Sequence, residues 1–347
     1  MDNHQWDVLT KTIKKEKTEK PPIGFIIDSP WIPGWLGIST LDYFTNDNIW
    51  FEANKKAIET FPEAMFLPGF WSEYGMCTEP SAFGSKLVWE TDRPPHADKV
   101  FKSIEETRSI NQPNVTKDGL LPFTINRLKI NQNRIEDLGH SIKFAVARGP
   151  LNIASFLLGT TEFMMACKTH PEDTHHFIKT ITSFVKDWLA FQIESFPSID
   201  GILLLDDIIG FLGDKDFQEF VVPYLSELYQ PFDVTIKFLH NDAHGLVTAP
   251  YLKQIGVNLF NFSFNHDMSA IKKLSGDSVA LLGNIPPRDI LALGTKEDVK
   301  NSVTSTLNAL EDHSGIIMSC GGGMPMDVSS ENINTFIEAV KEFHKPS

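Results

Sequence analysis

The stretch Val234-Thr-Ile-Lys-Phe-Leu-His-Asn-Asp242 is a short apolar run that stops at three polar residues. Its length and its β-branched and aromatic content are typical of a buried strand, and the polar residues mark the turn that follows. His240 and Asp242 are both residue types that ligate divalent metals. The stretch therefore predicts a strand whose end carries a functional site.

Seven other apolar runs end in the same way, at a polar or glycine turn, and helix-patterned segments lie between many of them. The other runs are 22–28, 64–69, 142–148, 201–206, 257–261, 279–283 and 315–320. The helix-patterned segments include 171–194, 216–229, 296–311 and 330–344. Near-continuous apolar strands alternating with helices indicate a parallel sheet covered on both faces. Eight such units in one chain predict an α/β fold of the (β/α)₈ TIM-barrel type.

The whole chain, residues 1–347, is expected to form one barrel domain. Residues 1–20 precede the first strand as an N-terminal extension. Residues 71–116 fit the repeating pattern poorly, so we expect a long insertion after the second strand. Because loops at the carboxyl ends of barrel strands surround the active site, this insertion should cover the barrel mouth.

Charge and composition exclude several classes of partner. The formal net charge is −14, and the chain has no Lys/Arg cluster of the kind that neutralises phosphates, so we expect no nucleic acid partner. No apolar run reaches the roughly 18 residues of a membrane span, and the N-terminus does not resemble a signal peptide. We therefore expect a soluble cytoplasmic protein. Its three cysteines are an odd number at wide spacings, which is no disulfide framework.

The ends of the predicted strands collect polar side chains. They offer Asp28, Arg148, Asp206 with Asp207, His240 with Asp242, Asn261, Asn284 and Cys320. His240, Asp242 and Cys320 together would bind zinc and leave one coordination position for a substrate, as catalytic zinc sites do. The alternative is that His240 and Asp242 hydrogen-bond each other or cap a helix while Cys320 packs in the core.

Two neighbouring features stay open in the same way. His244 could replace His240 as a ligand, or belong to the loop beyond it. Asp206 and Asp207 could supply a catalytic base or a fourth metal ligand, although paired carboxylates at a strand end are also common helix caps.

A set of ordered motifs resembles the uroporphyrinogen decarboxylase superfamily. They are Arg148-Gly-Pro150, Leu158-Gly-Thr160, Pro171-Glu172, Leu205-Asp-Asp207, His240-Asn-Asp242, Gly283-Asn284, Cys320-Gly-Gly-Gly323, Pro325 and Glu331-Asn332. The similarity is good over residues 140–343 and loose before them. It implies a (β/α)₈ barrel with one of two activities: decarboxylation of uroporphyrinogen without a cofactor, or zinc-dependent methyl transfer to or from corrinoid proteins.

The methyltransferase branch is the better match. Decarboxylases carry an arginine-rich early motif for the carboxylates of the tetrapyrrole, and residues 28–35 here contain no arginine. The branch's zinc motif, H-x-C with a distant Cys, aligns with His240, Asp242 and Cys320, so Asp242 replaces the first thiolate. A carboxylate leaves zinc a stronger Lewis acid toward oxygen. We therefore expect zinc to bind the oxygen of a methyl donor while the Co(I) corrinoid of a partner protein takes the methyl group.

The absence of a cobalt-binding motif indicates a separate corrinoid protein as partner. The D-x-H-x-x-G sequence that supplies a cobalt-ligating histidine is absent, so the corrinoid should arrive on a separate protein that docks at the barrel mouth. Two other activities remain alternatives: uroporphyrinogen decarboxylation, and methyl transfer from a methyl-corrinoid to a thiol. A non-catalytic tetrapyrrole or corrinoid carrier is a third.

The donor is expected to be a small molecule, best an aromatic methyl ether, because the N-terminal segments are rich in aromatic residues. Trp31, Trp35, Trp71 and Tyr74 are candidates for its pocket, together with Asn261 at a strand end, whereas ordinary core packing is the alternative for the aromatic residues. Glu73 is a catalytic candidate beside Asp206 and Asp207, because it could orient substituents on the ring.

Overall fold

Eight parallel strands form the centre of the computed structural model, which describes residues 1–16, 20–27 and 30–343. Each strand overlaps one of the eight predicted apolar runs. The strands are β1 (Gly24–Ile26), β2 (Met65–Leu67), β5 (Phe144–Arg148), β6 (Gly201–Leu205), β7 (Ile236–Asn241), β8 (Leu259–Phe262), β9 (Ala280–Ile285) and β10 (Ile316–Cys320). Asp28, expected at the end of the first strand, lies outside the described residues.

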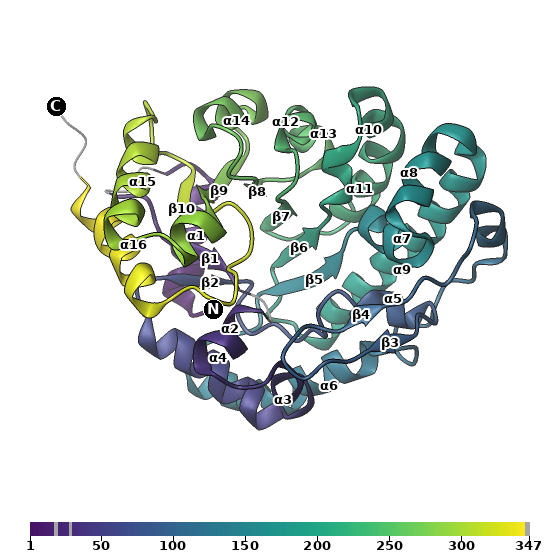
Figure 1. The fold of residues 1–347 in the computed structure, drawn as a ribbon, viewed down its shortest axis with the longest axis horizontal. Coiled ribbons are helices and arrows are strands. Elements are labelled where there is room, and N and C mark those ends of the chain that lie inside the picture. The colour runs from purple at the N-terminus through teal and green to yellow at the C-terminus, as the bar shows by residue number, and fades with distance from the viewer. Residues whose placement is uncertain (17–19, 28–29, 344–347) are drawn as a thin grey trace.

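The strands follow one another around a barrel, which confirms the predicted fold (Figure 1). Strands β5 to β10 pair in chain order, and β1 pairs with β2. Bridges from Ile23 to Met318 and from Ile26 to Gly323 join β1 to β10. In the described part of the chain no ladder connects β2 to β5.

Helices surround the strands on the outside (Figure 1). They are α1 (Asn3–Ile13), α2 (Trp31–Leu36), α3 (Thr40–Thr45), α4 (Asp47–Thr60), α5 (Thr78–Ala82), α6 (Leu121–Asp137), α7 (Pro150–Leu158), α8 (Thr160–Thr169), α9 (Pro171–Ser195), α10 (Asp214–Phe220), α11 (Val222–Tyr229), α12 (Gly245–Thr248), α13 (Leu252–Ile255), α14 (Met268–Ser275), α15 (Lys296–Asn308) and α16 (Ser330–Glu342). Short 3₁₀ turns cover Ile104–Ser109, Ile208–Phe211 and Ala249–Tyr251, and a π turn covers Pro287–Ala292.

One predicted helix is in fact interrupted. The segment 216–229 is two helices, α10 and α11, which separate at Val221. Pro223 is the reason, because proline has no N–H to donate and its ring clashes with the preceding turn of a continuous helix.

Alternation along the strands divides the core into two layers. Side chains such as Val146, Leu203 and Phe238 point into the barrel, while their neighbours Ala147, Leu204 and Leu239 pack against the helices. Both faces are apolar, as a parallel sheet covered on both sides requires.

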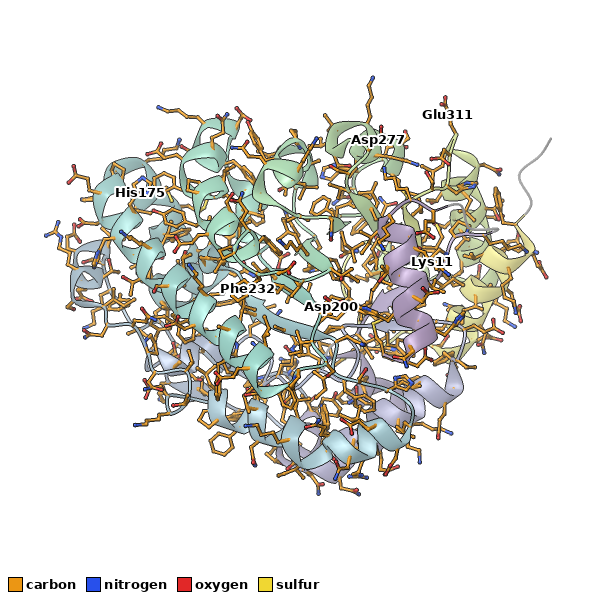
Figure 2. All side chains as sticks on the ribbon, turned by 180° about the vertical axis from the view of Figure 1, so that it is seen from behind. Lys11, His175, Asp200, Phe232, Asp277 and Glu311 are labelled. Atoms are coloured by element: carbon orange, nitrogen blue, oxygen red, sulfur yellow. The ribbon has the colours of Figure 1, made fainter. Side chains whose placement is uncertain are left out.

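Helix α1 closes the amino-terminal end of the barrel. Figure 2 shows it crossing the face that carries Asp200, which directly precedes β6. Leu9 packs into the interior cluster, and the ring of Trp6 lies 5.4 Å from that of Phe144. The opposite face, at the carboxyl ends of the strands, is therefore the one left for a site.

The segment 71–116 follows β2 and contains α5, the 3₁₀ turn Ile104–Ser109 and a small antiparallel hairpin. The hairpin strands are β3 (Leu87–Val88) and β4 (His96–Ala97). No helix in the described part of the chain combines the length and apolar character needed to cross a bilayer.

Candidate metal centre at the carboxyl ends of the strands

His240 is held at the end of β7 by a specific hydrogen bond. Strand register places it beside Asn261 of β8, and Asn261 Oδ1 lies 2.7 Å from His240 Nδ1. The Asn261 amide nitrogen donates to the carbonyls of Leu282 at 2.8 Å and Cys320 at 3.2 Å, which fixes the amide orientation. Oδ1 must therefore accept the Nδ1 proton, so the neutral ring keeps its lone pair on Nε2. Metal-binding histidines are commonly oriented in this manner.

Two carboxylates face that lone pair. His240 Nε2 lies 3.6 Å from Asp207 Oδ1 and 3.9 Å from Asp242 Oδ2, and one ligand atom from each residue lies within 4.8 Å of the others. The backbone N–H of Asp242 also donates to Asp207 Oδ1 at 3.0 Å. Burial raises the pKa of Asp242, the nearby Asp207 charge adds to the rise, and His240 opposes it.

This arrangement suits a divalent cation, because an imidazole nitrogen and two carboxylate oxygens are ligands for zinc and similar metals. A cation would also relieve the repulsion between the two acids. Gly322 completes the close packing, since a Cβ there would come within 3.1 Å of Asp242 Oδ2. Two residues of the predicted zinc trio are thus together, and Asp207, predicted as a base or fourth ligand, is the third member of the cluster.

Cys320 is not part of this cluster, which among the described residues contains Asp207, His240 and Asp242. It is fully buried with Ile316 and Met318 in the layer between strands and helices, and its sulfur lies 3.2 Å from the carbonyl of Gly322. Its connection to the site runs through the backbone, where its carbonyl accepts from Asn261. His244 is also outside the cluster, with its ring 5.8 Å from that of His266.

Asp206 occupies a helix-capping position. Its two oxygens accept from the backbone N–H groups of Leu151 and Asn152, both at 3.0 Å, in the first turn of α7. Burial raises the pKa of this fully buried carboxyl well above its usual range, and the two N–H donors oppose that rise. Both oxygens therefore face α7, which agrees with the alternative that Asp206 caps a helix.

Glu73 lies against Arg148, a residue expected at a strand end and in the motif Arg148-Gly-Pro150. Glu73 Oε2 accepts from Arg148 Nη2 at 2.8 Å, and both side chains are buried. The Arg148 backbone N–H donates to Glu79 Oε1 at 3.0 Å, and burial raises the pKa of Glu79. The guanidinium also lies over the ring of Trp71, 5.4 Å from its centre. Trp71 and Glu73 are thus close to the barrel mouth.

The other aromatic candidates have different surroundings. Trp31 is fully buried, stacks on Trp35 at 5.0 Å and donates to the carbonyl of Val328. The Trp35 indole donates to Ser330 Oγ at 2.8 Å. Both rings pack between α2, α4 and the segment before α16. This is the ordinary core packing that was the alternative to a donor pocket.

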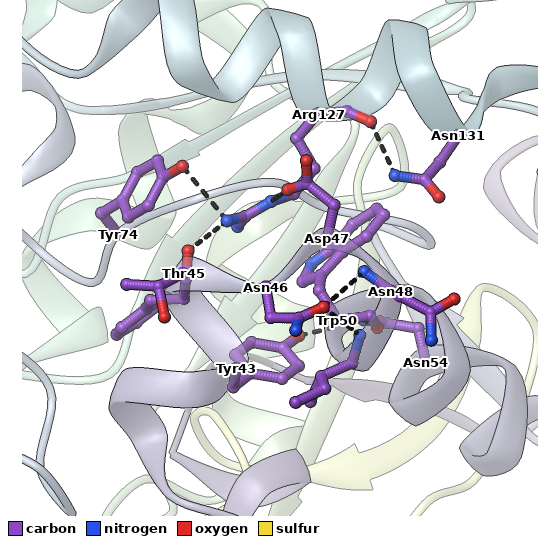
Figure 3. A network of polar contacts seen from close by, with 12 residues as sticks. Tyr43, Thr45, Asn46, Asp47, Asn48, Trp50, Asn54, Tyr74, Arg127 and Asn131 are labelled. Atoms are coloured by element: carbon purple, nitrogen blue, oxygen red, sulfur yellow. Dashed lines mark hydrogen bonds and ion pairs between the residues drawn. The ribbon is translucent and has the colours of Figure 1, made fainter.

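Tyr74 is turned toward α6. Figure 3 shows its hydroxyl beside Arg127, which donates to it at 3.1 Å and to Asp47 at 2.9 Å. Arg127 also donates to the carbonyl of Phe44. Arg127 is not predictable from the sequence as a buried residue, because a lone arginine in a helix is ordinarily a surface residue. It ties the helices after β1 to the loop that carries Glu73.

The family model for uroporphyrinogen decarboxylase (URO-D) matches residues 5–343. The chain belongs to the uroporphyrinogen decarboxylase family.

Relatives in this family carry two different names. A uroporphyrinogen decarboxylase from Pseudoalteromonas translucida is 23% identical over 279 residues, covering 77% of this chain and 76% of its own. A methylated-thiol–coenzyme M methyltransferase from Methanosarcina mazei is 24% identical over 274 residues, covering 78% of this chain and 71% of its own. Relatives with either name are therefore about equally similar to this sequence, at 23% and 24% identity.

Solved structures support the fold. A methyltransferase from Methanosarcina mazei superposes with a TM-score of 0.79 at 19% identity, covering 97% of this chain and 98% of its own. A B12-independent methionine synthase from Shewanella gives a TM-score of 0.55 at 11% identity, covering 93% and 96%. At these identities the likeness concerns the fold alone.

Proposed function

We propose that this chain is a metal-dependent methyltransferase that transfers the methyl group of a small O-methyl donor, best an aromatic methyl ether, to the Co(I) corrinoid of a partner protein. The observation that carries the proposal is the convergence of Asp207, His240 and Asp242, with the His240 lone pair directed at the two carboxylates. Zinc held there would supply a Lewis acid for the donor oxygen.

The charges at the barrel mouth favour a neutral donor. Asp207 and Asp242 lie on one side of the mouth, and the positive charge of Arg148 is paired with Glu73. A tetrapyrrole with eight carboxylates needs unpaired cationic groups, since each carboxylate is best bound by arginine. The mouth therefore suits methyl transfer better than uroporphyrinogen decarboxylation.

The residues have distinct tasks in this proposal. Asp207, His240 and Asp242 would hold the metal, and Asn261 binds the Nδ1 proton of His240, so that Nε2 is the ring nitrogen directed at the metal. Asp206 fixes the start of α7 next to the mouth. The O–CH₃ bond would break with its electron pair left on the donor oxygen, which would take up a proton from solvent, while the methyl carbon bonds to the Co(I) of the partner. The partner protein would dock over the carboxyl ends of the strands, where the donor is exposed to its corrinoid.

Metal analysis and a methyl-transfer assay test the proposal together. We expect close to one zinc per chain in the wild type and far less in His240→Ala. Methoxyarenes, methanol and methylamines are then supplied with cob(I)alamin, and the change from Co(I) to methyl-Co(III) is followed by absorbance. A protein that stays metal-free under zinc supplementation and transfers no methyl group would overturn the proposal. Formation of coproporphyrinogen from uroporphyrinogen would replace it with decarboxylation.

A further inference from the structure

Side chains replace a neighbouring strand at the free edge of β5. In the described part of the chain no ladder joins β5 to β2. Gln192 of α9 instead bonds Val146 twice, because its Oε1 accepts from the Val146 N–H at 3.0 Å and its Nε2 donates to the Val146 carbonyl at 2.9 Å. Glu79 of α5 accepts from the Arg148 N–H at 3.0 Å. These two side chains supply partners that buried backbone groups require, and they leave a seam between β2 and β5.

A small cavity of about 20 Å³ lies in this seam. Its walls come from the end of β2 and the loop after it, and from α5, α6, β5 and α9. Ser72, Glu79, Trp188 and Gln192 are among the residues that line it, and all four are buried. A water molecule needs roughly 10–15 Å³ of free space and about two to four polar partners. The cavity therefore has the volume for water and too little for a larger ligand.

Two polar atoms of the lining residues have no hydrogen-bond partner within the described part of the chain. They are Nε1 of Trp188 and Oγ of Ser72, and the two residues are 2% and 6% exposed. Trp188 belongs to α9, which packs against β5, whereas Ser72 follows β2. The two atoms thus come from opposite sides of the seam. Because a buried polar group without a partner is destabilising, both atoms call for a third group between them.

The chemistry of the lining determines what this group can be. The indole nitrogen of Trp188 only donates, so the bound group must carry a lone pair, which excludes a bare metal cation. The carboxyl oxygens of Glu79 accept hydrogen bonds in either protonation state, so the bound group must also donate. The Ser72 hydroxyl can do both. A small neutral molecule that accepts and donates meets these conditions, and at this volume that molecule is water.

We propose that the seam cavity is a binding site for a buried water molecule, which accepts from the Trp188 indole N–H and bonds to the Ser72 hydroxyl and the Glu79 carboxyl. The water joins the loop after β2 to α9 across the gap where backbone pairing is missing. Glu73 lies on the same loop and pairs with Arg148. The water therefore supports the loop that carries Glu73 to the barrel mouth. This inference does not depend on the proposed methyl transfer.

A high-resolution crystal structure of the wild-type protein tests the site directly. We expect an ordered solvent peak within about 3.2 Å of both Trp188 Nε1 and Ser72 Oγ. A cavity without such a peak would overturn the inference. An indole N–H that donates directly to a protein oxygen would overturn it as well.

A double-mutant cycle tests the same water in solution. Trp188→Phe and Ser72→Ala each remove one partner of the water, and urea unfolding gives the equilibrium constant of each variant. If one water bridges both groups, the double variant should differ about threefold or more from the product of the single effects, because uncoupled changes agree within about twofold. Multiplicative effects would refute the bridge.

Thr182→Val is the matched control for this cycle. Thr182 also lies on α9, and its buried Oγ1 likewise has no partner among the described residues, but it is not part of the cavity lining. Thr182→Val combined with Trp188→Phe should therefore give the product of the two single effects. The same departure from that product in the control pair would show that the coupling does not come from the seam water.

Discussion

Replacing Asn261 with leucine tests how much the orientation of the His240 ring contributes to metal binding, because the ring itself is retained. Leucine has a similar volume but removes the oxygen that accepts from Nδ1 at 2.7 Å. The imidazole can then carry its proton on Nε2, which faces Asp207 and Asp242. A protonated Nε2 cannot bind a metal.

The expected magnitude follows from the contacts that Asn261 makes. Loss of a group that orients a ligating histidine typically lowers metal affinity about 10–100-fold, which is about 1.4–2.7 kcal/mol. The carbonyls of Leu282 and Cys320 also lose their side-chain donor. If neither carbonyl finds another donor, the free energy of unfolding should fall by about 1–3 kcal/mol per carbonyl.

The assay is a zinc titration in competition with a chromophoric chelator, combined with urea unfolding of the metal-free protein. Asn258→Leu is the matched control. Asn258 also joins the segments of β7 and β8, because its Oδ1 accepts from the Lys237 N–H and its amide nitrogen donates to the Thr235 carbonyl, but it lies at the opposite end of the barrel. It should lose stability and keep its zinc affinity. Asn261→Asp retains an acceptor for Nδ1 and should bind zinc better than Asn261→Leu. A folded Asn261→Leu protein with zinc affinity within twofold of wild type would refute the reasoning.

Three further predictions concern neighbouring groups. Cys320→Ala should keep zinc affinity within about twofold, whereas Asp207→Asn should lower it tenfold or more in the same titration, because the sulfur lies outside the cluster. Asp206→Asn should lower the free energy of unfolding by about 1–2 kcal/mol in urea, since the amide oxygen can replace only one of two acceptors at the α7 terminus. Burial lowers the pKa of His140 to about 4, so the unfolded state binds its proton first as the pH falls below 6.5. Stability should therefore decrease from pH 6.5 to 4 by about 3 kcal/mol, and His140→Gln should show a flatter profile in urea unfolding over that range.

The barrel could be predicted from the sequence because its strands are apolar on both faces and stop at polar residues. Runs such as Gly201–Leu205 and Ile316–Cys320 contain too few residues for a helix and are followed by glycine or acidic turns. The β3–β4 hairpin could not be found in this way, because two strands of two residues each carry no periodic pattern.

Only part of the metal cluster could be predicted, because successive residues of a strand point alternately into the barrel and toward the helices. His240 points into the barrel with Phe238, whereas Cys320 lies with Ile316 and Met318 on the layer that faces the helices. When both faces of a strand are apolar, the sequence does not show which parity points inward. The support of His240 by Asn261 depends on the pairing of β7 with β8, which the sequence does not show.

The exchange of Cys320 for Asp207 changes the chemistry expected of the site. A thiolate would donate more charge to the metal and favour soft partners, whereas two carboxylates and one imidazole form a harder ligand set. Such a set favours oxygen over sulfur in the open coordination position. The ligand set at the mouth thus favours an oxygen compound as the methyl donor.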